Sequence, residues 1–173
     1  MIHALNGAVG YKIEYAGRSV VFTGDTTPCR FVVEMAQGCD LLIHECSVSP
    51  AMAAAASGKP VELVEAILKK AHTIPEQAGK VFEKAQPRMG ALWHLPLNPA
   101  IGQALADAQR HFGGPIVASQ DFTVFSVTAE AVVARQAEVD DRPAPVPGTS
   151  KAEIQLGEPN PEPEWWAAAR LDV

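Results

Sequence analysis

Four short apolar segments of this chain each run into polar or ionisable residues, and this pattern constrains the fold more than any other feature. Short apolar runs bounded by polar residues are typical of buried strands. The residues that follow them are, in chain order, Asp25, His44-Glu45, His94 and Asp121. Ligand sites in sheet-and-helix proteins gather beyond strand ends. The pattern therefore predicts a sheet that brings ionisable side chains toward one edge.

The segments between these strands favour helices and one hairpin. Residues 9–15 alternate apolar and polar side chains, Ala16-Gly17 supplies a turn and residues 19–23 form the returning strand, which predicts a hairpin. Helical spacing predicts helices over 29–37, 60–71, 73–86 and 99–112, with Thr73 as N-cap and Glu76 closing a capping box. Residues 47–58 are alanine-rich and fit a loop or a loose helix, and 122–133 are expected to complete the sheet. The order predicts an α+β or α/β fold, a mixed sheet with helices on one face.

Length and composition fit one folded domain. The chain has 173 residues and 18.4 kDa, with 47% hydrophobic and 20% charged residues, which excludes wholesale disorder. No apolar run reaches the roughly 18 residues of a membrane span, so no membrane partner is expected. Three cysteines without a CxxC pair do not make a disulfide framework.

Net charge argues against a dedicated nucleic-acid binder. The chain carries a formal charge of -6, with 14 basic against 20 acidic residues. Binding to a nucleic-acid backbone relies on many lysines and arginines. The acidic composition therefore favours a small-molecule substrate.

The last part of the chain differs in composition. Residues 143–163 hold six prolines, which predicts an extended arm, and two tryptophans follow in a short helical segment near 164–170. We expect two parts: a domain over 1–135 and a Pro-rich C-terminal arm with a short terminal helix over 136–173.

Five segments together carry a resemblance to a known family. The chain resembles the metallo-β-lactamase superfamily, on its ribonuclease Z-like branch, in motifs that occur in the family's order. These motifs are Gly10-Tyr11 with residues 17–26, residues 40–47 (the family's DLLIHEAT strand), 71–78 (its HTSxEEA helix start), 91–96 and 117–121. The resemblance covers roughly residues 3 to 128.

The resemblance implies roles for four residues. Asp25 matches the carboxylate that bridges two metal ions, and His94 matches an imidazole ligand of one of them, most often zinc. His72 and Glu45 match a pair beside the site that orients substrate or relays a proton.

Three further residues are candidates for the pocket: His3, His44 and Trp93. His3 stands where a family histidine lines the pocket, although it lies at a chain terminus. For His44 a structural role is the alternative, and Asp121 is expected to tether the end of the sheet.

One departure from the family is larger than any match. The family's metal site depends on an HxHxDH motif, which this sequence lacks. Two matched ligands are too few for tight zinc binding, so the resemblance implies the C-terminal half of an αββα sandwich. Such a half would expose an apolar face, and we expect the missing N-terminal half or a second copy in a homodimer to cover it. The face would hold Val20, Phe22, Leu41, Ile43, Leu92 and Val117.

Two functions remain open from the sequence. The first is a hydrolase that uses one or two zinc ions on a small ester, lactone or aryl substrate when complete, with weak or no zinc binding and no activity in this chain alone. The second is a non-catalytic half-domain that acts as an oligomerisation or binding module. A cytoplasmic location follows only if Met1 is the native start, and an upstream signal peptide stays open.

Overall fold

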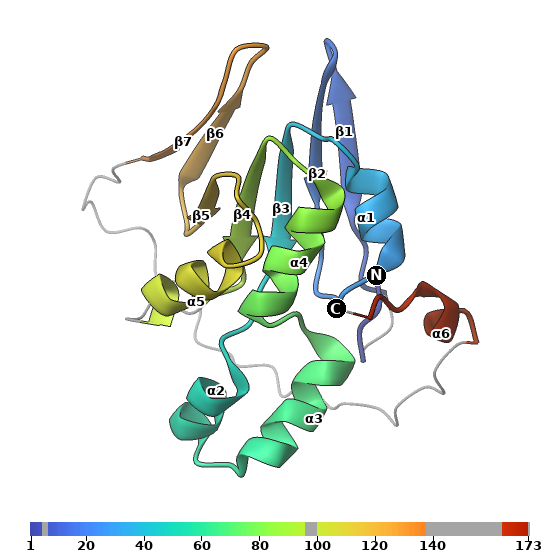
Figure 1. Ribbon diagram of the computed structural model, residues 1–173, viewed down its shortest axis with the longest axis vertical. Coiled ribbons are helices and arrows are strands. Elements are labelled where there is room, and N and C mark those ends of the chain that lie inside the picture. The colour runs from blue at the N-terminus through green and yellow to red at the C-terminus, as the bar shows by residue number, and fades with distance from the viewer. Residues whose placement is uncertain (5–6, 96–99, 138–163, 173) are drawn as a thin grey trace, which may run out of the picture.

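A five-stranded sheet forms the centre of the protein. The computed structural model describes residues 1–4, 7–95, 100–137 and 164–172. The strand order is β1-β2-β3-β4-β5, with β1 antiparallel to β2 and the remaining neighbours parallel (Figure 1). Parallel pairing places the carboxyl ends of β2, β3 and β4 at one edge of the sheet. The strands are β1 (Tyr11–Tyr15), β2 (Arg18–Phe22), β3 (Leu41–Glu45), β4 (Met89–Trp93) and β5 (Ile116–Ala118).

The predicted hairpin is present as β1 and β2. Ala16 and Gly17 have φ angles of 49° and 72°. Two consecutive residues with positive φ are the signature of the tight turn that matches the twist of paired strands.

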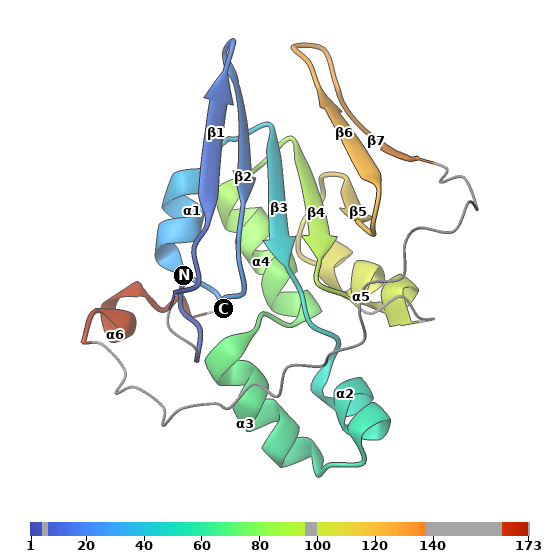
Figure 2. The same cartoon turned by 180° about the vertical axis from the view of Figure 1, so that it is seen from behind.

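Helices cover one face of this sheet. Figures 1 and 2 show α1, α4 and α5 packed on the same side, while α2 and α3 extend beyond the strand ends. The main core joins Val21, Leu42 and Leu92 of the sheet to Val32 of α1 and Phe82 of α4. The helices are α1 (Arg30–Ala36), α2 (Pro50–Ser57), α3 (Val61–Ala71), α4 (Pro75–Ala85), α5 (Ala100–Gln109) and α6 (Trp165–Ala169).

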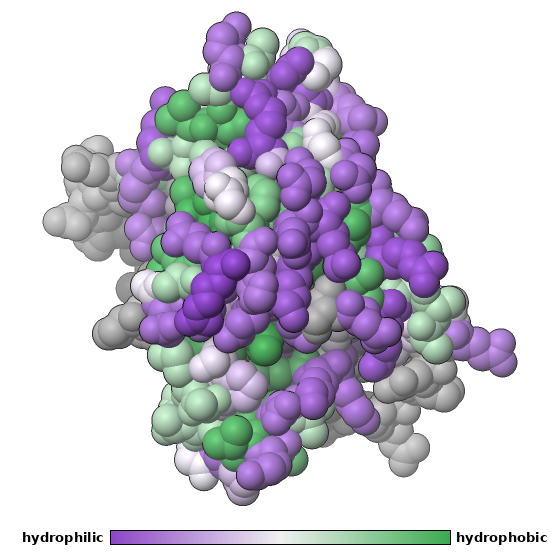
Figure 3. Space-filling model, in the orientation of Figure 1, coloured by the Kyte–Doolittle hydropathy of each residue, from purple (hydrophilic) through white to green (hydrophobic). Residues whose placement is uncertain are grey.

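The outer surface of the helical layer is mostly hydrophilic, with smaller apolar patches (Figure 3). Among the described residues, no helix combines the length and the apolar character needed to span a membrane.

The last two strands do not complete the sheet as predicted. β6 (Thr123–Val127) and β7 (Val132–Gln136) form a separate antiparallel hairpin. Its apolar side chains pack on the sheet face opposite the helices, against Leu41, Met89 and Ala91. The hairpin therefore covers part of the face that we expected to be open.

Leu92 was wrongly assigned to that open face. It pairs in register with His44 and lies in the helix-side core, fully buried. Neighbouring residues of a strand point to opposite faces, so Leu92 cannot share a face with Ala91.

The predicted N-cap of α4 was also wrong. Pro75 begins the helix and Ile74 precedes it, with the Ile74 amide donating to the Gln77 side chain over 3.3 Å. The Thr73 hydroxyl instead donates to the carbonyl oxygen of Thr26 over 2.7 Å.

The proline-rich segment lies outside the described residues. The short helix α6 follows it, where the terminal helix was predicted. The division into 1–135 and 136–173 stays a prediction.

Gly90 of β4 offers a test of the helix-side packing. A Cβ at this position would lie 2.9 Å from the ring of the buried Phe82. We expect Gly90→Ala to lower the free energy of unfolding by about 1–3 kcal/mol, because the crowded ring has no free volume to enter. Denaturant unfolding measures the loss.

The double variant Gly90→Ala/Phe82→Leu is the control for that cause. It should lose less than the sum of the two single losses, because the smaller side chain relieves the clash. Strict additivity would contradict the assigned contact.

Candidate functional site

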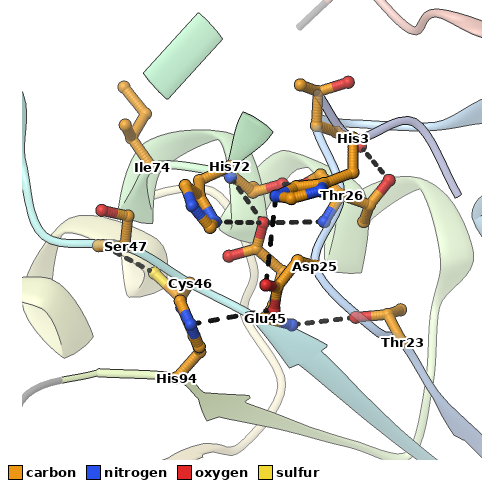
Figure 4. Close-up of polar contacts among 12 residues, drawn as sticks. His3, Thr23, Asp25, Thr26, Glu45, Cys46, Ser47, His72, Ile74 and His94 are labelled. Atoms are coloured by element: carbon orange, nitrogen blue, oxygen red, sulfur yellow. Dashed lines mark hydrogen bonds and ion pairs between the residues drawn. The ribbon is translucent and has the colours of Figure 1, made fainter. Parts of the chain in front are cut away.

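Five ionisable side chains meet at the carboxyl edge of the parallel strands. Asp25 follows β2, Glu45 ends β3 and His94 follows β4, while His72 follows α3 and His3 comes from the N-terminal segment. Figure 4 shows these side chains pointing toward one another. Of the residues in the strand-end pattern, Asp25, Glu45 and His94 converge here, whereas His44 and Asp121 lie outside the cluster.

The Asp25 carboxylate lies between two imidazoles. Its Oδ2 is 4.0 Å from His3 Nε2, and its Oδ1 is 3.8 Å from His94 Nε2. The ring of His72 stacks on that of His94, with centroids 5.1 Å apart, and lies edge-on to His3 at 5.4 Å. Each oxygen of the Asp25 carboxylate thus faces an imidazole nitrogen, at a separation too long for a direct hydrogen bond.

Glu45 is the buried anchor of this cluster. Its side chain is fully buried, and Oε1 accepts hydrogen bonds from the amides of Thr26 at 3.0 Å and Thr73 at 2.9 Å. The same oxygen lies 3.5 Å from His72 Nδ1. The Glu45 carboxylate beside the ring raises the pKa of His72, against the opposing effect of burial.

Three buried threonines hold the strand ends around Glu45. The Glu45 amide donates to Thr23 Oγ1 over 2.9 Å, and the Thr73 hydroxyl reaches the Thr26 carbonyl. Each threonine is fully buried. Sequence reasoning gave none of them a role in the site. The sequence did contain a signal for this role: threonines stand directly beside Asp25 and His72. Polar groups at strand ends need hydrogen-bond partners once they are buried, and threonine hydroxyls can supply them.

The backbone of His94 adopts a left-handed conformation, with φ of 69°. Non-glycine residues in this region cost about 1–3 kcal/mol and cluster at functional sites. Histidine tolerates the region better than most residues. The strain turns the chain sharply after β4 and leaves the His94 ring beside Asp25.

His44 does not reach this cluster. It is fully buried, its Nδ1 lies 2.7 Å from the carbonyl oxygen of Glu45, and its ring meets Phe82 edge-on at 6.3 Å. Burial lowers the pKa of His44, which favours the neutral ring. The expectation that His44 lines the pocket is therefore wrong, and its place in the core agrees with the structural alternative.

Trp93 borders the site from the other side of His94. It lines a cavity of about 280 Å³ together with His94 and Asp121. Its ring lies edge-on to His94, with centroids 5.4 Å apart. The backbone carbonyl of Asp121 accepts from the Gln136 side chain over 2.6 Å, so this residue also ties β7 to the end of β5.

The donor set fits a metal ion. Two groups of three side chains have ligand atoms within 4.8 Å of one another: His3, Asp25 and His72, and Glu45, His72 and His94. Glu45 Oε2 and His72 Nδ1 are buried without a hydrogen-bond partner among the described residues. Orphaned buried polar atoms call for an explanation, and imidazole with carboxylate is a ligand chemistry that zinc accepts.

Curated relatives of the chain are ribonucleases. It is 33% identical over 120 residues to "Ribonuclease Z" of a Synechococcus strain, an alignment covering 66% of this chain and 33% of the relative. "Ribonuclease Z" of Archaeoglobus fulgidus is 29% identical over 114 residues, covering 65% and 33%. These matches confirm the predicted resemblance to the ribonuclease Z-like branch of the metallo-β-lactamase superfamily over about two thirds of this chain. The chain spans about a third of the length of these relatives, and no protein-family model matches it.

Two solved structures also resemble part of this chain. The metallo-β-lactamase fold protein YhfI of Bacillus subtilis has a TM-score of 0.48 and 21% identity, covering 63% of this chain and 40% of that one. The short form of human tRNase Z has a TM-score of 0.44 and 19% identity, covering 69% and 38%.

The relatives correct one expectation. The acidic composition favoured a small-molecule substrate and spoke against nucleic acid, but the matched relatives are named as ribonucleases. Net charge describes the whole surface, whereas a substrate meets a local one, so the inference from charge was wrong.

The Glu45–His72 pair predicts a pH dependence of stability in metal-free protein. Because the pKa of His72 is raised on folding, its contribution is complete below the ordinary histidine value of about 6.5 and is lost as pH rises through the folded pKa. Glu45→Gln removes the carboxylate charge. The stability gap between wild type and variant should therefore narrow with rising pH.

Denaturant unfolding between pH 5.5 and 8 in EDTA measures this gap, and proton NMR of His72 reports its pKa directly. A gap that stays constant over this range, with an unchanged His72 titration, would contradict the pairing.

Proposed function

We propose that this chain carries part of the active site of a metal-dependent hydrolase whose substrate is RNA. The observation that carries the proposal is the Asp25 carboxylate, whose two oxygens face His3 and His94 separately. The relatives named ribonuclease Z support RNA as the substrate class.

Zinc is the metal we propose for this site, with Asp25 as the central ligand. His94 faces one of its oxygens and His3 the other, and His3 and Asp25 also belong to one of the two groups with close ligand atoms. When bound, zinc would supply Lewis-acid stabilisation of the negative charge that develops on a phosphoryl oxygen. His3 enters the proposed site from geometry, because its Nε2 faces the second oxygen of Asp25.

Glu45 and His72 serve the proton transfer in this proposal. The carboxylate lies 3.5 Å from the ring and raises the pKa of His72 in the metal-free protein. A protonated imidazole at the edge of the site can donate to the oxygen that leaves when a phosphodiester bond breaks. Thr26 and Thr73 fix the carboxylate through their amides.

A non-catalytic oligomerisation module remains the second candidate, and a row of exposed side chains favours it. Tyr11, Ile13 and Tyr15 of the edge strand β1 are 61%, 61% and 82% exposed. Ile13 pairs with Val20, which lies on the face that β6 and β7 cover only in part. An apolar edge strand of this kind is prone to pairing, so we propose a second copy as its partner.

Zinc uptake tests the proposed metal site. The chain should retain zinc after gel filtration. Asp25→Asn should weaken zinc binding at least tenfold, because it removes the negative charge that the two carboxylate oxygens share. Isothermal titration with elemental analysis measures both.

Asp121→Asn is the matched control, since Asp121 lies beyond Trp93 and outside both metal-binding groups. Equal zinc affinity in wild type and Asp25→Asn would refute the site.

RNA hydrolysis tests the proposed activity. Because the sequence lacks HxHxDH, we expect slow zinc-dependent cleavage of a transfer RNA by this chain, and loss of that cleavage in Asp25→Asn and His72→Ala. Gel analysis of labelled RNA gives the rate. A chain that binds zinc but cleaves no RNA would favour the non-catalytic module.

Sedimentation tests the proposed second copy. The chain should sediment with twice its 18.4 kDa mass, and Ile13→Lys should shift it to the monomer by placing a charge on the exposed row. Lys12→Glu changes a neighbouring charge on the same strand and serves as control. A wild-type chain that sediments as a soluble monomer would contradict this proposal.

A further inference from the structure

The C-terminal segment 164–172 packs beside the site although it is distant in sequence. Trp166 and Ala169 of α6 are buried in the main core, where Cys29 is also buried. Arg170 forms an antiparallel bridge with Cys29, and the Leu171 amide donates to the Pro28 carbonyl over 3.3 Å. Figures 1 and 2 both show the last described residues of this segment beside the N-terminus and the loop that follows β2.

This segment forms one wall of a cavity of about 240 Å³ that His72 also lines. The opposite wall comes from α3 and the start of α4. The lining residues are Thr27, Pro28, Lys69, His72, Gln77, Arg170, Leu171 and Asp172. The cavity therefore adjoins the Glu45–His72 pair through the side chain of His72.

Two cationic side chains border this cavity from different elements. Lys69 comes from the last turn of α3 and Arg170 from the end of α6, and both are exposed. Lys69 also lies 2.8 Å from Glu65 Oε1, and Asp172 contributes an acidic group to the same wall. A bound anion would thus meet two cations and one carboxylate, with Thr27 and Gln77 as neutral polar neighbours.

We propose that this cavity is a phosphate subsite, in which Arg170 and Lys69 bind a backbone phosphate of single-stranded RNA beside the bond to be cleaved. The inference rests on the proposed function for its substrate class. Guanidinium groups bind phosphate through paired hydrogen bonds. The C-terminal segment is then part of the substrate site, with Trp166 as the anchor that positions Arg170.

Binding without cleavage tests the subsite separately from the proposed activity. The probe is fluorescein-labelled pentauridylate, titrated with the full chain in EDTA and followed by anisotropy over a range of salt concentrations. Arg170→Ala should weaken binding about five- to tenfold and lower the slope of log K against log salt by about 0.7, the value for one lost contact to a single strand. Arg170→Lys should recover part of the affinity.

Two further variants test the sign of the charge effect. Asp172→Asn should tighten binding, because it removes the carboxylate from the cavity wall. Arg135→Ala changes an exposed arginine on β7, outside the cavity lining, and should leave affinity and salt slope unchanged. Circular dichroism and thermal unfolding verify that each variant is folded.

Competition separates phosphate binding from base binding. Inorganic phosphate should displace pentauridylate from wild type, and uridine without phosphate should not. Equal affinity of wild type and Arg170→Ala for pentauridylate would overturn the subsite, whatever the cleavage assay shows. Wild type that binds neither pentauridylate nor phosphate would overturn it as well, while zinc uptake and hydrolysis would still decide the proposed function.

Discussion

The buried Glu45 carboxylate is the interaction on which the rest of the site depends. It accepts two backbone amides from segments that follow β2 and α3, and its own amide donates to Thr23. A fully buried carboxylate is costly unless such donors compensate it. Once they do, the loops bearing Asp25 and His72 are fixed relative to β3. The geometry of the candidate site is thus a consequence of how the buried Glu45 carboxylate is hydrogen-bonded.

The sheet supplies the second constraint. Parallel pairing of β2, β3 and β4 brings Asp25, Glu45 and His94 to one edge, and the strained backbone of His94 turns its ring back toward Asp25. The same alternation along β3 sends His44 into the core and leaves Glu45 at the site. His44 and Glu45, which are neighbours in one motif, therefore lie on opposite faces of the sheet.

Sequence reasoning located the strands and most helices, and it named all five clustered side chains as candidates. It failed where the local sequence pattern does not determine which strand or backbone group a residue pairs with. Alternating residues in β6 and β7 predict strands but do not say which sheet they join, and the hairpin packs across the sheet because Phe125 and Val127 find an apolar face there. Thr73 resembles a helix cap in sequence, but the buried Thr26 carbonyl competes for its hydroxyl. Strand alternation alone would have placed Leu92 correctly.

Both ends of the described chain hold the same short loop. The Ile2 amide donates to Thr26 Oγ1 over 2.9 Å, the Thr27 amide donates to the Ile2 carbonyl over 2.8 Å, and the Leu171 amide donates to Pro28 from the other side. Segments held by few hydrogen bonds open more readily than central strands. Local opening of either segment would release the loop at Thr26, which supplies one of the amides bonded to Glu45. Amide hydrogen exchange around Thr26 should therefore follow the opening of these two segments, while the central strands β3 and β4 stay protected.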